Sequence, residues 1–469
     1  MGRLWRRASA KSLEPGTGIG ATSRRVETMQ KKFSVRGLRW WMLLFFVLVM
    51  LFNYIDRASL SIALSLITAD FGINEAAAGI LSSAFFWSYT LMQIPGGMLV
   101  KKFKPRKTVS IAIIGWGIVQ ALTAVASSLN VFVIFRVLLG IFESPVQNGM
   151  NTATLTWLRK DERGRGSTII DSGGPLGSAI GSILVTGLIV WLGTWRAAFI
   201  FLGAITLLIG VLAWSFIRNS PSDHPWITQD EANYLDEAIA EEVEQEKTVS
   251  EEQTVASKPA LTRLSPWMLL IAFAAYDAVQ YGLLTWAPYY ISKSLGISFG
   301  ITGVASMFVY LGGFAGEMVV GQLSDHWLKR GGTPNKVMRT LFVLAGIGVT
   351  VCTLLVNVVA SVVVAIALLT IANFFTRWGG LYWSVPQQIV HRAEVPTLSA
   401  AMNFAGNAAG IAIPIIVGFI ASATGSFTGV FILFGVCGII MALSSAILNY
   451  ESGPTQSVLA VQDKPVVAK

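Results

Sequence analysis

Residues 40–67 read WWMLLFFVLVMLFNYIDRASLSIALSLI, a run long and apolar enough to cross a lipid bilayer as one helix. A spanning helix needs about 20 mostly apolar residues, because the hydrocarbon core is about 30 Å thick. Two adjacent charges, Asp56 and Arg57, stand inside this run. Charges at such depth are costly unless they are paired or hydrated, and they mark functional positions by default. The stretch therefore predicts a membrane helix that carries part of a site.

The composition of the chain supports this interpretation. Of its 469 residues, 53% are hydrophobic and 13% are charged, and the mean hydropathy is +0.61. Soluble domains carry about 25% charged residues. The net charge of +9 would suggest a nucleic-acid partner in a soluble protein, but the basic residues cluster between apolar runs, so membrane topology explains them better. The two cysteines lie in apolar runs and the three histidines are isolated, so we expect no disulfide, metal site or cofactor.

Apolar segments of spanning length recur along the chain. We expect twelve, in two groups of six separated by a polar segment. Their approximate ranges are 40–67, 77–100, 108–128, 131–156, 167–191, 195–217, 265–291, 298–321, 337–357, 359–385, 396–422 and 427–448. The predicted fold class is an all-α membrane protein with twelve transmembrane helices in two six-helix bundles around a central cavity.

The same pattern predicts the domain boundaries. We expect an N-terminal cytoplasmic extension over 1–38, bundles over 39–217 and 264–449, a cytoplasmic linker over 218–263 and a C-terminal tail over 450–469. The first 28 residues are basic and lack the apolar core of a secretory signal. A transit peptide and a true start at Met29 are the alternatives. In the linker, Thr228 and Glu231 have capping-box spacing and predict the start of a surface helix. The acidic run after it is typical of a solvated linker.

Basic residues set the expected orientation. They gather after the second, fourth and eighth segments, at Lys101, Lys102, Lys104, Arg106, Lys107, Arg159, Lys160, Arg163, Arg165, Lys329, Arg330, Lys336 and Arg339. The alternate loops are short and nearly uncharged. Because cytoplasmic loops carry the excess of lysine and arginine, both termini are predicted to lie in the cytoplasm of a multi-pass protein of the cell membrane.

Charges inside the spans indicate where a site lies. The first, fourth, seventh and tenth segments hold six of eight such residues, namely Asp56, Arg57, Arg136, Glu143, Asp277 and Arg377; the other two are Asp171 and Glu317. The recurrence at the same position in each group of three helices predicts four helices around one polar cavity. Arginines there would recognise an organic anion, because guanidinium matches a carboxylate. Carboxylates there could exchange protons, because burial disfavours their charged form.

The charges also have a structural interpretation. Asp56 with Arg57, and Arg136 with Glu143, could be ion pairs that only lock helices together, although buried pairs seldom stabilise more than apolar packing does. For Asp171, Asp277 and Arg377 both interpretations stay open, and Glu317 is expected to be structural. Tyr281 shares a helical face with Asp277, and it could either bind substrate or pack.

Several motifs together resemble one family. They are NYIDRASLSIA at 53–63, SYTLMQIPGG at 88–97, FRVLLGIFESP at 135–145, WLRKDERGRG at 157–166, SPSDHPWIT at 220–228, LLTWAPYYI at 283–291, GQLSDHWLKRGG at 321–332 and MNFAGNAAG at 402–410. Over residues 40–448 the sequence is similar to the major facilitator superfamily and, within it, to the anion:cation symporters. That resemblance implies bacterial sugar-acid carriers of the galactonate, hexuronate and glucarate type.

The resemblance implies roles for single residues. Asp56 and Glu143 match the protonatable pair, and Arg136 matches the arginine that is the ion-pair partner of the acid below it. Substrate-side positions are matched by Arg57, Tyr89, Ser384 and Asn403; to these the residues themselves add Tyr281 and Arg377. The gating loops correspond to Gly97, Lys101, Arg106, Gly321 and Asp325.

The sequence also departs from the family pattern. Lys101 stands where the first gating loop has an aspartate, so that loop's usual interaction must be missing or replaced. Gly174 stands where galactonate carriers can have a glutamine, which weakens an assignment to galactonate itself. Arg377 has no counterpart in the pattern, and it could recognise a second carboxylate, as in a diacid.

These observations predict a proton-coupled symporter that imports an organic anion by alternating access. A sugar acid (aldonate, uronate or aldarate) is the expected substrate, with the proton and the lipid bilayer as further partners, and the protein is expected to act as a monomer. A phthalate-like aromatic acid is the first alternative. A drug–proton antiporter is the next, although GGPLGSAIG at 173–181 fits the antiporter motif only partly. A sensor built on a carrier fold would need a signalling domain, and we expect none in this sequence. An enzyme is not expected either, because the sequence contains no catalytic constellation and no phosphate-loop motif.

Overall fold

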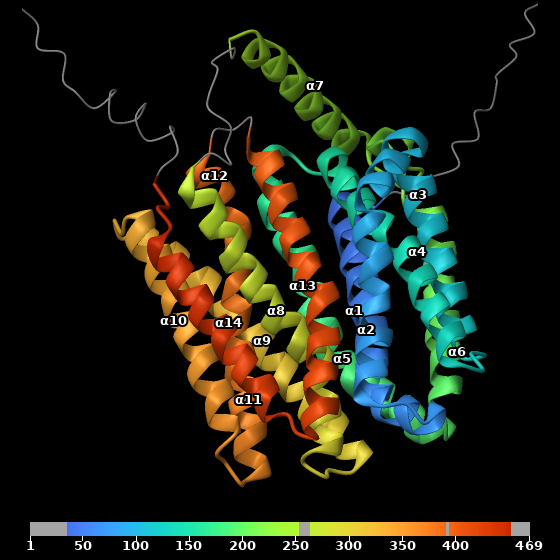
Figure 1. Ribbon diagram of the computed structural model, residues 1–469. Coiled ribbons are helices and arrows are strands. Elements are labelled where there is room, and N and C mark those ends of the chain that lie inside the picture. The colour runs from blue at the N-terminus through green and yellow to red at the C-terminus, as the bar shows by residue number, and fades with distance from the viewer. Residues whose placement is uncertain (1–34, 253–262, 391–393, 452–469) are drawn as a thin grey trace, which may run out of the picture.

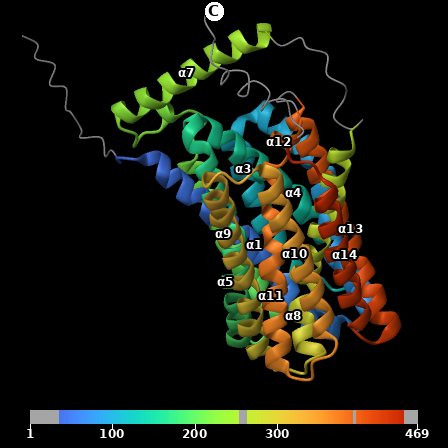
Figure 2. The same ribbon diagram turned by 90° about the vertical axis from the view of Figure 1, so that its left-hand side faces the viewer.

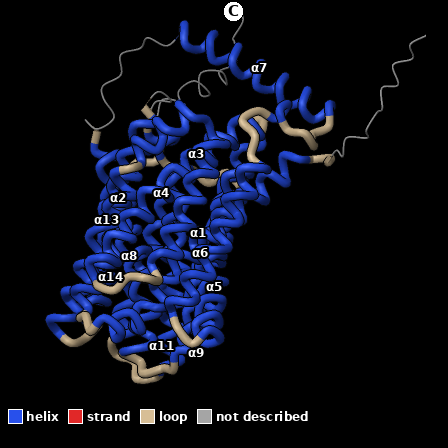
Figure 3. Tube along the Cα trace, turned by 90° about the vertical axis from the view of Figure 1, so that its right-hand side faces the viewer, coloured by secondary structure: helices blue, strands red, loops and turns tan. Residues whose placement is uncertain are grey.

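The computed structural model describes residues 35–252, 263–390 and 394–451. Within these residues the regular structure is helical, apart from one isolated bridge between Val35 and Ile227 (Figure 3). The expected all-α fold class is confirmed to that extent. The proposed start at Met29, most of the N-terminal extension and the tail beyond Glu451 lie outside the described residues.

The first half of the chain forms one helical bundle. Its helices are α1 (Leu38–Phe71), α2 (Glu75–Leu91), α3 (Gln93–Thr123), α4 (Leu129–Trp157), α5 (Lys160–Leu192) and α6 (Trp195–Phe216). Side-chain caps begin several of them; the Oδ1 atom of Asn74, for example, accepts the backbone N–H of Ala77 at 3.0 Å. Gly72 ends α1 at a φ of 62°, a left-handed conformation that suits glycine. In the bundle, α1 packs on α5, and α3 packs between α4 and α6.

The second half forms the other bundle (Figure 1). Its elements are α8 (Leu264–Lys293), α9 (Phe299–Lys329), α10 (Pro334–Val356), α11 (Val362–Thr376), the 3-10 helix η3 (Arg377–Ser384), α12 (Pro386–Ile389), α13 (Val395–Thr424) and α14 (Thr428–Ile447). Here α8 packs on α13 and α14, while α10 and α9 pack on α11. Between the two bundles, α2 lies against α13, α5 against α9 and α1 against α8. Figure 2 shows α5 and α9 side by side.

Ten helices in the described residues are long and apolar enough to cross a membrane. The predicted spans 77–100 and 108–128 are not among them, because the helix boundaries in this region differ from the predicted ones. The helix α2 ends at Leu91. The helix α3 then includes the last part of the predicted span 77–100 and most of the predicted span 108–128. Inside α3, Lys104 has a φ of 69° immediately before Pro105, so two helices meet there at a kink.

The two bundles contact each other at the end opposite to α7 (Gln229–Glu252), where α2 lies against α13 (Figure 1). The hydroxyl of Ser83 in α2 donates to the backbone oxygen of Ile411 in α13 at 2.7 Å. Nearer the same end, Tyr289 of α8 donates to Glu75 of α2 at 2.9 Å. Gly79 is required here because a Cβ at that position would collide with the backbone of Pro414. Toward α7 the ribbons of α2 and α13 diverge (Figure 1).

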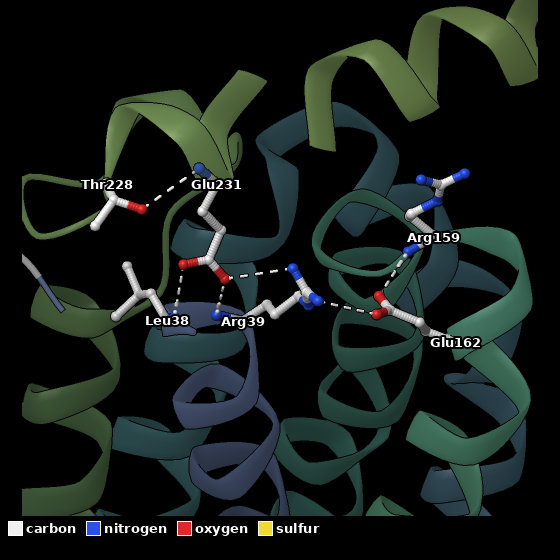
Figure 4. A network of polar contacts seen from close by, with 6 residues as sticks. All are labelled: Leu38, Arg39, Arg159, Glu162, Thr228 and Glu231. Carbon is white, nitrogen blue, oxygen red and sulfur yellow. Dashed lines mark hydrogen bonds and ion pairs between the residues drawn. The ribbon is translucent and has the colours of Figure 1, made fainter. Parts of the chain in front are cut away.

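The linker packs against the first bundle through the carboxylate of Glu231 (Figure 4). Its two oxygens accept the backbone N–H groups of Leu38, at 2.9 Å, and of Arg39, at 3.2 Å. The side chain of Arg39 then reaches Glu162 at the start of α5, at 3.1 Å. As the capping-box spacing predicts, the hydroxyl of Thr228 accepts the backbone N–H of Glu231 at 3.4 Å and α7 begins at Gln229. The Glu231 carboxylate, however, caps α1.

A second contact holds α7 further along. Both terminal nitrogens of Arg163 donate to the carboxylate of Glu242, at 2.7 and 2.6 Å. Between the two contacts, Ala232 and Leu235 are buried. Glu242 belongs to the acidic run that the sequence suggested to be a solvated linker. Within the described part of the run, Glu242 thus contacts a basic residue of α5, while Glu237 is exposed to solvent.

Candidate functional site

Arg57 of α1 and Glu143 of α4 form an ion pair. The Nε and Nη2 atoms of Arg57 both donate to Oε1 of Glu143, at 2.9 and 2.5 Å. The other oxygen, Oε2, is buried and has no hydrogen-bond partner in the described residues. The Arg57 side chain remains 11% exposed and that of Glu143 only 1%. Arg57 is therefore the more accessible residue of the pair.

Asp56 points to a different neighbour. Consecutive residues on a helix do not share a face, so Asp56 faces α6 while Arg57 faces α4. The hydroxyl of Thr206 donates to Oδ2 of Asp56 at 3.2 Å, and Oδ1 has no partner in the described residues. The side chain is completely buried. Asp56 and Arg57 are thus not paired with each other.

Arg136 of α4 lies between the two acids without pairing with either. It is 2% exposed, and its Nε and Nη2 atoms have no partner in the described residues. It interacts electrostatically with Asp56 and Glu143, but no ion pair within 4.0 Å includes it there. Its role as an ion-pair partner stays a prediction. A buried guanidinium with unused donors is costly, and the electrostatic attraction of Asp56 and Glu143 offsets part of that cost.

Aromatic rings enclose the guanidinium of Arg57. Its Cζ atom lies 5.1 Å from the ring centre of Tyr54, 5.0 Å from that of Phe85 and 5.1 Å from that of Tyr89. Tyr89 stacks on Phe85, and Phe86 meets Tyr281 edge-on with ring centres 4.7 Å apart. Such rings attract a cation through their faces and hold it in one orientation. The expected substrate residues Arg57, Tyr89 and Tyr281 are thereby brought into one region.

A small cavity separates Arg57 from Arg136. Its volume is about 30 Å³, room for about two water molecules. Its walls include Ser61 of α1, Ser82 of α2 and Thr285 of α8. Both arginines and hydroxyl groups from both bundles therefore line this cavity, among apolar side chains.

The second bundle contains a similar ion pair. The Nε atom of Arg377 donates to Oε2 of Glu317 at 3.0 Å, and its Nη2 atom donates to the same oxygen. Arg377 stands where α11 gives way to η3, so the helix changes geometry at the charge. Interrupted membrane helices commonly form substrate sites, and a 3-10 stretch within a helix often marks a functional hinge. Glu317, which the sequence suggested to be structural, is the ion-pair partner of Arg377.

Tyr54 connects the two ion pairs. Its hydroxyl interacts electrostatically with Arg57, with Arg377 and with Asp171 of α5. Asp171 is exposed and interacts electrostatically with Glu317 and Arg377. Charged residues of both bundles, which the sequence grouped only by helix number, thus lie near one tyrosine.

The remaining predicted substrate residues belong to the second bundle. Ser384 donates to the backbone oxygen of Leu381 at 2.8 Å, and the side-chain oxygen of Asn403 accepts from Asn407. Both Ser384 and Asn403 are partly exposed. Their roles in substrate binding stay predictions.

The predicted gating residues lie toward the α7 end. Lys101 and Asp325 are exposed and make no hydrogen bond or ion pair within the described residues. Arg106 donates to the backbone oxygen of Trp214 at 3.1 Å, and its guanidinium lies over the same indole. Gly97 and Gly321 are partly exposed helical positions. Lys101 stands in place of the family's gating aspartate, and in this conformation it makes no ion pair within the described residues that would replace the interaction of that aspartate.

Sequence reasoning missed Tyr54, Phe85 and Thr206. Tyr54 precedes Arg57 by one helical turn, a spacing that could have placed it on the same face. Nothing in the sequence connects Phe85 or Thr206 with the charges, because both contacts join different helices.

Comparison with known proteins gives the family. Residues 46–414 match the model of the Major Facilitator Superfamily. The chain belongs to this superfamily. Similar proteins include a probable galactarate/D-glucarate transporter of Bacillus subtilis (strain 168), 28% identical and covering 92% of this chain and 94% of its own. The hexuronate transporter of the same strain is 27% identical over 87% and 93% of the two chains. A D-galactonate transporter of Escherichia coli O6:H1 is 26% identical over 87% and 95%.

Solved structures support the fold. A bacterial homologue of the human lysosomal transporter Spinster, inward-facing and occupied, superposes with a TM-score of 0.67 at 16% identity, over 93% of this chain and all of the other. The Escherichia coli xylose transporter in its inward-open conformation also gives 0.67, at 17% identity, over 88% and 96%. The protein is therefore a transporter and not an enzyme, and it is a multi-pass protein of the plasma membrane.

Proposed function

We propose that this transporter is a proton-coupled symporter that imports an organic anion, with a sugar acid as the substrate. The observation that carries the proposal is the Arg57–Glu143 pair, in which one glutamate oxygen accepts both guanidinium donors and the other is buried without a partner. A substrate carboxylate offers two oxygens to the same planar fork and can displace the glutamate. The galactarate/D-glucarate, hexuronate and D-galactonate relatives transport acids of this class.

Displacement of Glu143 couples the anion to a proton. Once Arg57 turns to the substrate, Glu143 loses its ion-pair partner and is left as a buried carboxylate with only the more distant charge of Arg136. An ionised carboxylate in that position is strongly disfavoured, so Glu143 takes up a proton as the anion binds. Asp56, buried beside Thr206, is the second proton-carrying group of the proposal.

Alternating access supplies the direction. In this conformation the bundles meet through Ser83 and Ile411 and diverge toward α7, so the site opens on the α7 side. We assign that side to the cytoplasm, because the basic loops lie there and cytoplasmic loops are lysine- and arginine-rich. The proposal also includes twelve spans. In it, α2 and the part of α3 before the kink at Lys104 form the second span, and the rest of α3 forms the third. We keep the domain boundaries given above and propose a monomeric protein.

Uptake into proteoliposomes tests the proposal. The panel contains D-glucarate, galactarate, galacturonate, D-galactonate and phthalate, with an inward proton gradient. At least one sugar acid should accumulate, and a protonophore should abolish the accumulation. Phthalate uptake without sugar-acid uptake would favour the aromatic alternative, which the rings around Arg57 could also serve. Accumulation that is insensitive to the gradient would contradict proton coupling.

Glu143→Gln separates binding from coupling. The variant keeps the size of the side chain but cannot take up a proton. It should still exchange internal for external substrate while losing accumulation against a gradient. Glu237→Gln changes an exposed acid of α7 outside the cavity and serves as a matched control.

A further inference from the structure

Asp277 is a buried carboxylate without a partner. It lies near the middle of α8, is 8% exposed, and makes no hydrogen bond or ion pair within the described residues. A Cβ on Gly406 of α13 would collide with its Oδ2 atom, and the ring of Phe273 lies beside the same position. The carboxyl group therefore fills a space that glycine leaves next to an aromatic ring, and no protein donor among the described residues stabilises a negative charge there.

The cation nearest to Asp277 is already engaged. Arg377 interacts electrostatically with Asp277, but its Nε and Nη2 atoms donate to Glu317. Asp171 interacts with the same arginine from the other bundle. One cation thus serves three carboxyl groups, whereas in the first bundle Arg57 and Arg136 balance Asp56 and Glu143.

The other elements packed against α8 do not restore the balance. Neither α12 nor α13 carries a titratable side chain within the described residues, while η3 begins with Arg377. The titratable or charged groups that α1, α9, α14 and α8 itself present nearby are Tyr54, Arg57, Glu317, Cys437, Tyr276 and Tyr281. No second free cation stands beside Asp277 in the described residues, so its ionised form is uncompensated.

We propose that Asp277 is a third proton-carrying group of the transport cycle, located in the second bundle. The inference rests on the proposed symport. An anion cannot easily enter a space that holds uncompensated carboxylates, because each one repels it. Asp277 therefore binds a proton from the outer solution before the anion enters. When the site opens toward α7, its O–H bond breaks, the proton passes to water on that side, and the carboxylate repels the departing anion.

A third proton would have a consequence for the energetics of import. Each charge that crosses the membrane exchanges about 2.3 kcal/mol per 100 mV with the potential. An aldarate carries two negative charges, so protons on Asp56 and Glu143 only neutralise it. A proton on Asp277 makes the loaded carrier move net positive charge inward, and an interior-negative potential then drives uptake.

Equilibrium accumulation tests the proposal. In proteoliposomes without a membrane potential, the logarithm of the accumulation ratio of radiolabelled D-glucarate, or of the other panel acid that the protein accumulates, is plotted against the imposed pH difference. Each coupled proton contributes a factor of ten per pH unit. Asp277→Asn should lower the slope by one unit, a tenfold loss of accumulation per pH unit. Asp223→Asn, an exposed acid of η1 (Pro221–Asp223), should keep the wild-type slope.

The equilibrium readout distinguishes the proposal from its alternatives. A variant that is merely slower or less stable reaches the same ratio later, so a structural role leaves the slope unchanged. An unchanged slope with a raised KM would mean that Asp277 only binds substrate hydroxyls, and the proposal would be wrong. If the wild-type protein itself shows no slope, the proposed symport fails rather than this inference.

An infrared measurement covers the case in which Asp277→Asn does not fold. In the Asp56→Asn/Asp171→Asn protein, labelled with ¹³C-aspartate and saturated with the acid that the wild-type protein accumulates, a protonated aspartic acid should give a shifted carbonyl band at neutral pH. Adding Asp277→Glu should abolish the labelled band and keep the fold. Absence of the band in the parent protein would overturn the proposal.

Discussion

The carboxylate of Glu231 in the linker accepts the backbone N–H of Leu38 at the start of α1, at 2.9 Å, across 193 residues of sequence. The first N–H groups of a helix have no partner inside the helix, and a negative charge at that end also suits the helix dipole. Glu231 therefore supplies to α1 what a local cap supplies to other helices. The linker is consequently part of the first bundle at this point and not a free tether.

Removing this carboxylate should destabilise the first bundle. Glu231→Ala leaves the N–H groups of Leu38 and Arg39 without acceptors, so we expect a loss of about 1–2 kcal/mol in the free energy of unfolding. Glu231→Gln keeps one acceptor and should lose less. Thermal unfolding in detergent, followed by tryptophan fluorescence, measures both. Glu237→Gln, an exposed acid on the same helix, is the control, and equal behaviour of Glu231→Ala and Glu237→Gln would contradict the capping role.

The Arg163–Glu242 pair should hold α7 in place while adding little stability. Both side chains are 20% exposed, and exposed pairs contribute roughly 0–1 kcal/mol. Arg163→Glu should speed amide hydrogen exchange in α7 with a small change in the unfolding temperature. The double variant Arg163→Glu/Glu242→Arg should recover part of the protection, because the pair is restored with reversed polarity. No recovery in the double variant would show that the two residues act independently.

Acid should loosen the linker through His224. The backbone N–H of Trp226 donates to Nδ1 of His224 at 3.2 Å, so Nε2 carries the proton and donates to the oxygen of Phe216 at 3.1 Å. Burial, and secondarily the charge of Arg218, hold the pKa of His224 below its ordinary value of 6.5. The neutral ring is the native form. Its contribution to stability is therefore complete above pH 6.5 and is lost as the pH falls below that value.

Amide exchange of α7 measures this effect. Protection factors, corrected for the intrinsic pH dependence of exchange, should fall as the pH is lowered from neutral through 6.5, the ordinary pKa of histidine. His224→Phe keeps an aromatic ring among Trp157, Phe216 and Trp226 but cannot titrate. Its α7 should be less protected at neutral pH and insensitive to acid. A wild-type protein whose α7 protection ignores pH would refute the role of His224.

The sequence predicted which charged residues lie near one another better than it predicted their partners. The helix positions of Asp56, Arg57 and Glu143 sufficed to expect a polar site, since charges in a membrane need a reason. That Arg57 pairs with Glu143 depends on how α1 and α4 are rotated against each other, which packing of apolar faces decides. In the same way, the Thr228–Glu231 spacing predicted the start of α7 locally, while the acceptor role of Glu231 toward α1 arises only from the tertiary fold.

Arg57→Lys should weaken substrate binding without removing the charge. Lysine cannot reproduce the planar fork that reaches Glu143 or lie among the three rings in the same way. We expect a rise in KM of about 10–100-fold, the equivalent of one charged hydrogen bond lost. Arg196→Lys, in an exposed pair with Asp70 at the closed end, should leave KM unchanged. Equal effects of the two substitutions would place the substrate carboxylate elsewhere.

Gly79→Leu should stop the transport cycle by holding the closed end apart. A Cβ on Gly79 would meet backbone atoms of Pro414, and backbone cannot move aside as a flexible side chain can. The substitution therefore opposes the conformation seen here and favours the one open at the other end. A cysteine at Thr285, which is 7% exposed here, should then react with an impermeant maleimide from that end once the buried Cys352 and Cys437 are replaced. Gly187→Leu has open space around it and is the control. Continued uptake by Gly79→Leu, without new labelling at position 285, would show that α2 and α13 need not close there.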